Sequence, residues 1–110
     1  MAKIRAIIKR PDEKIGHVCN ISHTLENLQK TVEGYIEVIP IEENIVLICN
    51  EEGKHKGLEH NFKMPYDTIV GTIIVCNVEG EDCADFPFVD LPEGYIKTWK
   101  KLLQEWGNPI

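Results

Sequence analysis

Apolar residues recur along this chain at two spacings, one typical of strands and one of helices. In KIRAIIK, residues 3–9, positions 4, 6 and 8 are apolar and positions 5 and 9 are basic, the period of two expected of a half-buried strand. Ile45–Cys49 is apolar throughout, which favours a central strand covered on both faces. The same reasoning predicts strands over residues 3–9, 15–22, 35–41, 45–49 and 68–78. Pro40 favours a strand end or an edge strand, and Gly71 favours a bulge or a close backbone approach.

Helical spacing occurs twice. Leu25, Leu28 and Val32 fall at i, i+3 and i+7, so we expect a helix that Ser22 or Thr24 caps. Gly34 stands where a left-handed residue commonly ends a helix.

A second amphipathic helix is expected at the C-terminus. Asp90 would cap it and Glu93 would complete a variant of the capping box. Its apolar face would comprise Ile96, Trp99, Leu103 and Trp106. Such a stripe is usually core, and it could also form a homo-oligomer contact. The pattern predicts one α+β domain over residues 1–110, in the order β-β-α-β-β-β-α. We expect a small mixed or antiparallel sheet that carries one helix, with the second helix at the C-terminus.

Composition narrows the classes of function. The 110 residues are 43% hydrophobic and 27% charged, which is typical of a globular domain, and the net charge is −6. An acidic balance argues against direct binding to nucleic acid or to anionic membranes. No apolar run reaches the roughly 18 residues of a membrane span, so we expect a cytoplasmic protein.

The four cysteines do not form a recognisable metal or disulfide pattern. Cys49 and Cys76 lie inside apolar runs, where free cysteine behaves as a small hydrophobe, so we expect reduced thiols. His17 and Cys19 would share a strand face, but zinc ligands normally occur as closely spaced pairs. Cys83 stands among acidic residues that would raise its pKa. We expect no metal and no cofactor.

The longest polar segment between apolar runs is NEEGKHKGLEHN, residues 50–61. Its first five residues suit a hairpin turn with a bulge, which would place Lys54 and Lys56 on a short edge strand. Backbone amides and the two lysines could instead hold an anion, although no P-loop spacing is present. The expected ligand- or partner-binding residues are Asn50, Gly53, Lys54, His55, Lys56, Gly57 and Asn61.

Two other functions remain open. A small hydrolase or nucleotide-processing enzyme would use His55 or His60 with Glu51 or Asp67, because histidine titrates near neutral pH. A mimic of nucleic acid would use the acids between Met64 and Ile96, a stretch without any Lys or Arg. These acids are Asp67, Glu79, Glu81, Asp82, Asp85, Asp90 and Glu93.

The order of motifs resembles a family of small proteins of unknown function from phages, prophages and mobile elements, mainly of Gram-positive bacteria. The blocks that carry the resemblance are GYIEVIPI, then VLICNEEGKHKGLEHN, then DTIVGTIIV, and it extends over about residues 3 to 106. Residues 60–64, HNFKM, depart from the prolines and arginines that relatives often have. The resemblance implies an accessory role in a bacterial host cell. We therefore expect a non-catalytic protein that binds a host protein or a small anionic, nucleotide-like ligand, as an inhibitor or sponge of host defence.

Overall fold

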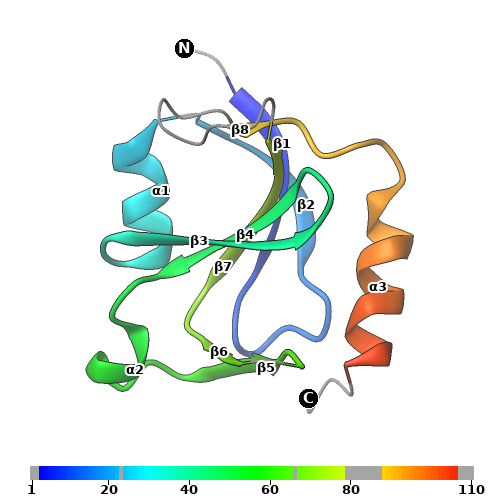
Figure 1. Ribbon diagram of the computed structural model, residues 1–110. Coiled ribbons are helices and arrows are strands. Elements are labelled where there is room, and N and C mark those ends of the chain that lie inside the picture. The colour runs from blue at the N-terminus through cyan, green and yellow to red at the C-terminus, as the bar shows by residue number, and fades with distance from the viewer. Residues whose placement is uncertain (1–2, 23, 66, 79–87, 107–110) are drawn as a thin grey trace.

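The computed structural model describes residues 3–22, 24–65, 67–78 and 88–106 (Figure 1). The strands are β1 (Lys3–Lys9), β2 (His17–Ser22), β3 (Ile36–Glu42), β4 (Ile45–Asn50), β5 (His60–Lys63), β6 (Thr68–Val70), β7 (Ile73–Val78) and β8 (Phe88–Val89). The helices are α1 (Leu25–Val32), α2 (Gly53–Lys56) and α3 (Tyr95–Glu105). The main sheet has the order β2-β1-β7-β4-β3, with β8 also paired to β7, and β5 and β6 form a separate two-stranded sheet. The pairings between the described strands are antiparallel.

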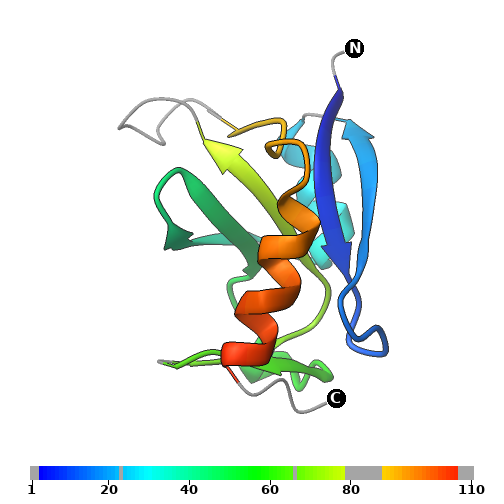
Figure 2. The same cartoon turned by 90° about the vertical axis from the view of Figure 1, so that its right-hand side faces the viewer.

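The two long helices cover opposite faces of the main sheet (Figures 1 and 2). On the α1 face, Leu28 and Val32 pack with Ile48 and Ile74 in one apolar cluster. On the α3 face, the second cluster includes Ile7, Leu47 and Val75 of the sheet and Trp99 and Leu103 of the helix. Because both faces are covered, every residue of β4 is buried, as the unbroken apolar run predicts.

The small β5–β6 sheet and α2 lie together at one end of the molecule (Figure 1). Phe62, Met64 and Ile69 extend the α3-side core into this sheet. Trp99 meets the Phe62 ring edge-on at 5.7 Å, and Trp106 stacks on the same ring at 6.0 Å. The aromatic stripe of α3 therefore packs inward, onto its own chain.

Helix α1 has the expected start and an unexpected end. Thr24 is the cap, since its Oγ1 accepts a hydrogen bond from Asn27 N at 3.1 Å. The left-handed residue at the end is Glu33, with φ of 65°, so the expected left-handed Gly34 is wrong. Glycine is required at position 34 for a steric reason, because a Cβ there would lie only 2.6 Å from Asn50 Nδ2.

The predicted strand over residues 68–78 is two strands. Gly71, with φ of 76°, breaks the run, and β6 and β7 belong to different sheets. A Cβ on Gly71 would lie 2.8 Å from Leu58 Cδ1, which is the close approach that an internal glycine indicates. The single strand was predicted because β-branched residues continue on both sides of Gly71, as TIV before it and TIIV after it, so the composition does not mark the break.

Helix α3 begins later than its capping pattern indicates. Gly94 precedes its first turn and no side chain caps that turn, so the predicted Asp90 cap is wrong. Asp90 Oδ1 instead accepts a hydrogen bond from the backbone nitrogen of Arg5, at 2.7 Å. The predicted apolar face of α3 is confirmed, because Trp99 and Leu103 are buried and Ile96 and Trp106 are partly buried against the same core.

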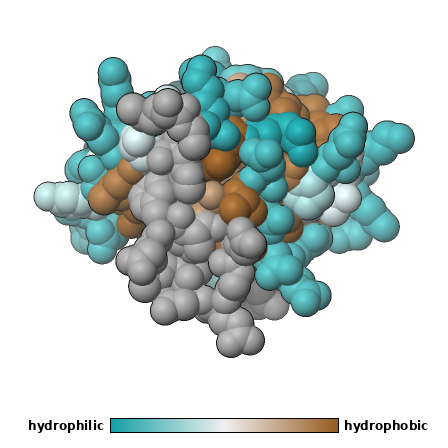
Figure 3. All heavy atoms as spheres, turned by 90° about the horizontal axis from the view of Figure 1, so that it is seen from above, coloured by the Kyte–Doolittle hydropathy of each residue, from teal (hydrophilic) through white to brown (hydrophobic). Residues whose placement is uncertain are grey.

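The α+β class, the antiparallel sheet and the C-terminal helix are confirmed. The predicted order of elements differs, because it omits α2, β5 and β8 and merges β6 with β7. Among the residues described, no helix is both long enough and apolar enough to cross a membrane. Seen from the end of the molecule opposite α2, the visible described residues are mostly hydrophilic, with apolar residues between them (Figure 3).

Candidate functional site

The corner between β4 and α2 is built around Asn50, which is 5% exposed. Its Oδ1 accepts a hydrogen bond from Glu52 N at 2.7 Å, and its Nδ2 donates one to the Val32 carbonyl at 3.0 Å. The same side chain therefore shapes the turn and attaches it to the end of α1. Its polar groups are already used inside the protein.

The segment after Asn50 is a single helical turn, so the predicted bulged hairpin and its edge-strand lysines are wrong. Leu58 N donates to the Gly53 carbonyl at 3.0 Å and Gly57 N donates to the Lys54 carbonyl at 3.2 Å. This is the Schellman pattern, and Gly57 takes the left-handed position with φ of 69°. The glycine that ends this turn was the sequence signal for α2.

Gly53 brings α2 against the small sheet. The residue is buried, and a Cβ on it would lie only 2.8 Å from Val70 Cγ2 of β6. Together with the hydrogen bonds of Asn50, this contact places the side chains of Lys54 and His55 between the main sheet and the small sheet.

Asn61 is fully buried and lies apart from the exposed residues of α2. Its Nδ2 donates to the carbonyls of Lys9 and Gly71, at 3.0 and 2.8 Å. Its Oδ1 accepts from Lys9 Nζ at 2.5 Å, and that ammonium also lies 5.8 Å from the centre of the Phe62 ring. The amide of Asn61 thus joins β1, β5 and the break before β7.

Lys9 is the polar residue that sequence reasoning missed. It is 0% exposed, and burial lowers its pKa from 10.5 to about 8, against the opposing influence of Glu13 and Asp12. In the sequence Lys9 reads as the solvent-facing member of an alternating strand. Only its pairing with Asn61, 52 positions away, shows that it points inward.

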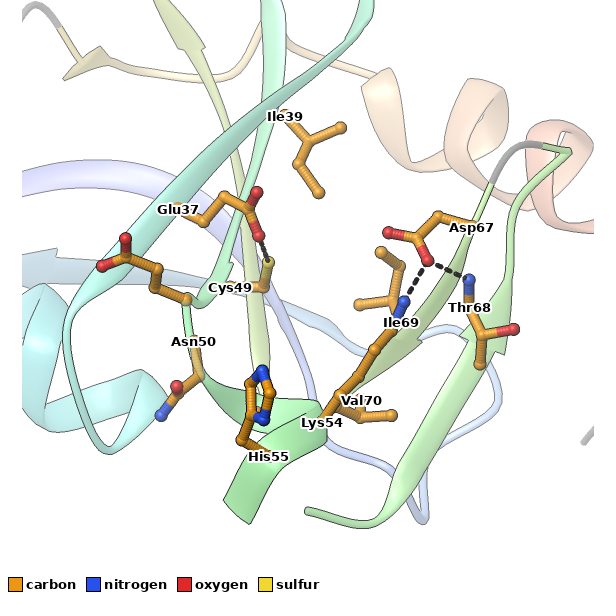
Figure 4. Close-up of a pocket in the computed structure, with 12 residues that line it drawn as sticks. Glu37, Ile39, Cys49, Asn50, Lys54, His55, Asp67, Thr68, Ile69 and Val70 are labelled. Atoms are coloured by element: carbon orange, nitrogen blue, oxygen red, sulfur yellow. Dashed lines mark hydrogen bonds and ion pairs between the residues drawn. The ribbon is translucent and has the colours of Figure 1, made fainter. Parts of the chain in front are cut away.

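A polar cavity of about 260 Å³ lies between β3, β4, α2 and β6 (Figure 4). Its lining includes Asn50, Gly53, Lys54 and His55 from the predicted set, whereas Lys56, Gly57 and Asn61 do not line it. Lys56 and Gly57 are exposed. The lining that sequence reasoning missed comprises Glu37, Ile39, Cys49, Thr68, Ile69 and Val70.

Carboxylates dominate the charge of this cavity. Glu37, Glu51 and Asp67 face it, against Lys54 and His55. Lys54 forms an ion pair with Asp67, whose Oδ1 also accepts a hydrogen bond from Thr68 N at 2.7 Å (Figure 4). The hydrogen bond from Lys54 and that from Thr68 lower the pKa of Asp67, so this carboxylate is ionised at neutral pH.

Cys49 is the one thiol among the described lining residues. Its Sγ lies 3.9 Å from Glu37 Oε1 and the residue is 5% exposed. Burial and the nearby Glu37 raise its pKa to about 12, so the thiol stays protonated at neutral pH and is a poor nucleophile. Cys19, Cys49 and Cys76 are free, and Cys83 lies outside the described residues.

The acid–base residues considered for catalysis are only partly together. His55, Glu51 and Asp67 line the same cavity, whereas His60 is exposed at the start of β5. No hydrogen bond or ion pair within the described ranges joins His55 to either acid. Nor do the described residues contain a group of three His, Cys, Asp or Glu suited to a metal.

A second cavity of about 520 Å³ adjoins the first and shares Glu37, Ile39 and Asp67 with it. The rest of its lining is Pro40, Ile41, Met64, Pro65, Leu102 and Trp106. The shared residues make the two cavities one groove, which we call the β3–β6 groove. It has a polar end near α2 and an apolar end near the C-terminal part of α3.

The acids considered for nucleic-acid mimicry are dispersed where they can be placed. Asp67 precedes β6 at one end of the molecule, and Asp90 follows β8 at the other (Figure 1). Glu79, Glu81, Asp82 and Asp85 lie outside the described residues. The described acids therefore form no single stripe.

Comparison with known proteins gives one match. No curated protein and no solved structure matched the chain. The model of a family described as a domain of unknown function, DUF3846, matches residues 4–104. That range includes the main sheet except Lys3, the groove except Trp106, and α3 except Glu105. The chain belongs to the DUF3846 family.

Proposed function

We propose that this protein is a non-catalytic binding protein of a phage or mobile element, which acts in the host cytoplasm by capturing a segment of a host protein. The observation that carries the proposal is the β3–β6 groove, whose polar and apolar cavities share Glu37, Ile39 and Asp67. A groove with both kinds of lining suits a polypeptide, which presents charged and apolar side chains side by side.

The charge of the polar end favours a protein segment over a small anionic ligand. Of the two basic residues there, Lys54 is already paired with Asp67, which leaves the carboxylates of Glu37 and Glu51 without a described cationic partner. An anion would meet net negative charge. A nucleotide-like ligand would have to draw Lys54 away from Asp67.

A hydrolase has weaker support. His55, Glu51 and Asp67 share the cavity, but a general base needs a second group to orient it, and no described residue bonds to His55. The Cys49 thiol, with its raised pKa, offers no nucleophile. A protein that binds an exposed segment of a host defence protein can inhibit it without catalysing any reaction.

A homo-oligomer through α3 would have to use the edge of its apolar stripe. Trp99 and Leu103 are buried in the protein's own core, and Ile96, Leu102 and Trp106 are partly buried against it. We therefore propose that one copy of the chain is sufficient for binding. Sedimentation equilibrium of the purified protein checks this.

The proposal is tested by affinity capture from lysates of Gram-positive bacteria, with mass spectrometry of both proteins and small molecules. Wild type is compared with Glu37→Lys, which reverses a charge shared by both cavities, and with Glu43→Lys, which makes the same change in the exposed β3–β4 turn. We expect a host protein that wild type and Glu43→Lys retain and Glu37→Lys loses. Capture of a nucleotide alone, or no difference between the two variants, would contradict the proposal.

A further inference from the structure

The two long walls of the β3–β6 groove present different parts of their strands. Strand β3 contributes Glu37, Ile39 and Ile41, which are alternate residues and so belong to one face of the strand, together with Pro40, which has no N–H group to offer a further strand. Strand β6 contributes Thr68, Ile69 and Val70, which are consecutive. Since successive side chains point to opposite sides, a strand lines a cavity with consecutive residues when its edge borders that cavity.

That edge of β6 carries no strand partner in the described chain. Strand β6 pairs with β5 alone, through Lys63–Thr68, Phe62–Ile69 and His60–Val70. The amide of Thr68 bonds to the side chain of Asp67 and not to β5. A two-stranded sheet is marginal without further support, and an extended peptide that adds to an open edge is a common mode of recognition.

The residues that line the groove also indicate which side chains such a peptide would carry. At the polar end, the carboxylates of Glu37 and Glu51 lack a described cationic partner, so they suit a lysine or arginine. At the other end, Met64, Leu102 and Trp106 offer apolar surface. Both ends lie over the same face of β3, and side chains on one side of an extended peptide recur every second residue, about 7 Å apart.

We infer that the groove binds an extended partner segment, which adds as a third strand to β6 and carries a Lys or Arg two or four positions from a large apolar residue. The cation lies against Glu37 and the apolar side chain lies against Trp106 and Met64. The inference rests on the proposed function, because it names what the captured segment must contain.

The test is selection of 12-residue peptides from a random display library on wild-type protein, with Glu37→Lys and Glu43→Lys as the variant and its matched control. We expect selected sequences to share the Lys or Arg and the apolar residue at this spacing. A synthetic copy should bind Glu43→Lys as it binds wild type and should bind Glu37→Lys at least about tenfold more weakly, because attraction becomes repulsion. Hydrogen exchange with this peptide bound should slow at those amides of residues 68–70 that point away from β5, because a new strand protects only these.

The outcomes separate this inference from the function on which it rests. Peptides that depend on Glu37 but leave exchange at residues 68–70 unchanged overturn strand addition, and peptides that carry no basic residue overturn the inferred Lys or Arg; both results leave the groove as the binding site. The same holds if no selected peptide depends on Glu37 while affinity capture still yields a Glu37-dependent protein. If affinity capture fails as well, the proposed function is overturned with it.

Discussion

The buried ammonium of Lys9 makes a specific prediction about stability and pH. Lys9 is 0% exposed, and its pKa is about 8 in the folded protein against 10.5 when it is solvated. Between these two values the unfolded chain binds more protons than the folded one, so the free energy of unfolding rises with pH. Below pH 8 the lysine is charged in both states, and its burial lowers the free energy of unfolding by the full amount that the two pKa values imply. Above pH 10.5 it is neutral in both and that cost is gone.

The size of the effect follows from the two pKa values. Their separation corresponds to about 3.4 kcal/mol at neutral pH, of which about 2.5 kcal/mol should be recovered between pH 7 and pH 10. The wild-type curve alone would hide this gain. Burial raises the pKa values of Cys49 and Cys76 to about 12, and thiols that ionise only in the unfolded chain lower stability over the same range.

The comparison with Lys9→Met isolates the lysine, because the cysteines are common to both proteins. Methionine keeps the length of the side chain, and the loss of the hydrogen bond to Asn61 is a constant offset at every pH. Urea unfolding under reducing conditions, followed by tryptophan fluorescence at pH 7, 8, 9 and 10, gives the difference between the two free energies of unfolding.

We expect this difference, wild type minus variant, to rise by about 2.5 kcal/mol from pH 7 to pH 10. Lys63→Met is the control, since Lys63 is an exposed lysine of β5, and its difference should stay flat. A flat difference for Lys9→Met would refute the burial of a charged amine at this position. A falling difference would show that its pKa is raised in the folded state.

Three further substitutions test the contacts that hold the groove. Asn50→Ala removes two hydrogen bonds and should lower the free energy of unfolding by about 2 kcal/mol, measured as a lower urea midpoint at an unchanged m-value, whereas Asn20→Ala on the exposed edge strand should be nearly neutral. Gly53→Ala should cost about 1–3 kcal/mol, and it should cost less in a Val70→Ala background, because the atom that the new Cβ meets is gone; equal costs in the two backgrounds would contradict the close approach. Trp99→Phe loses the hydrogen bond from Nε1 to the Ile15 carbonyl at 2.6 Å and should cost about 2–4 kcal/mol by the same assay.

The local hydrophobic pattern was enough to predict the elements that the neighbouring layer of the fold covers. Lys3–Lys9 was predicted with the same bounds as β1, and Ile45–Cys49 lacks only the last residue of β4. The apolar stripe of α3 was also predictable, because helical spacing states which side meets the core. Pro40 correctly marked β3 as an edge strand.

Local patterns failed where a distant residue competes for a group. Asp90 has the spacing of a helix cap, but its carboxylate accepts a hydrogen bond from the backbone nitrogen of Arg5 instead. Lys9 alternates like a surface residue, but Asn61 provides a buried acceptor. In the turn after Asn50, the prediction took Gly53 as the glycine of a hairpin. The residue that indicates the structure is Gly57, because a left-handed glycine commonly ends a helix.

The groove could be predicted only in part, because its lining comes from several separate elements. Lys54 and His55 belong to the polar segment that the sequence singled out, and they do reach the groove. Glu37 and Ile39 lie on a strand, in an alternation that reads as an ordinary edge. The local sequence pattern does not indicate that this side of β3 faces an open groove and is not covered by a helix.

This division of roles decides which variants can test binding. Asn50 and Gly53 were predicted as site residues, but their contacts with Val32, Glu52 and Val70 hold the walls of the groove at their spacing. Their substitution would change stability and groove width together, so a loss of binding there would not identify a contact. Glu37 is exposed, faces both cavities and forms no described ion pair. Reversal of its charge therefore alters the chemistry of the groove while the contacts that shape the groove remain, and binding by that variant is the direct measure of what the groove recognises.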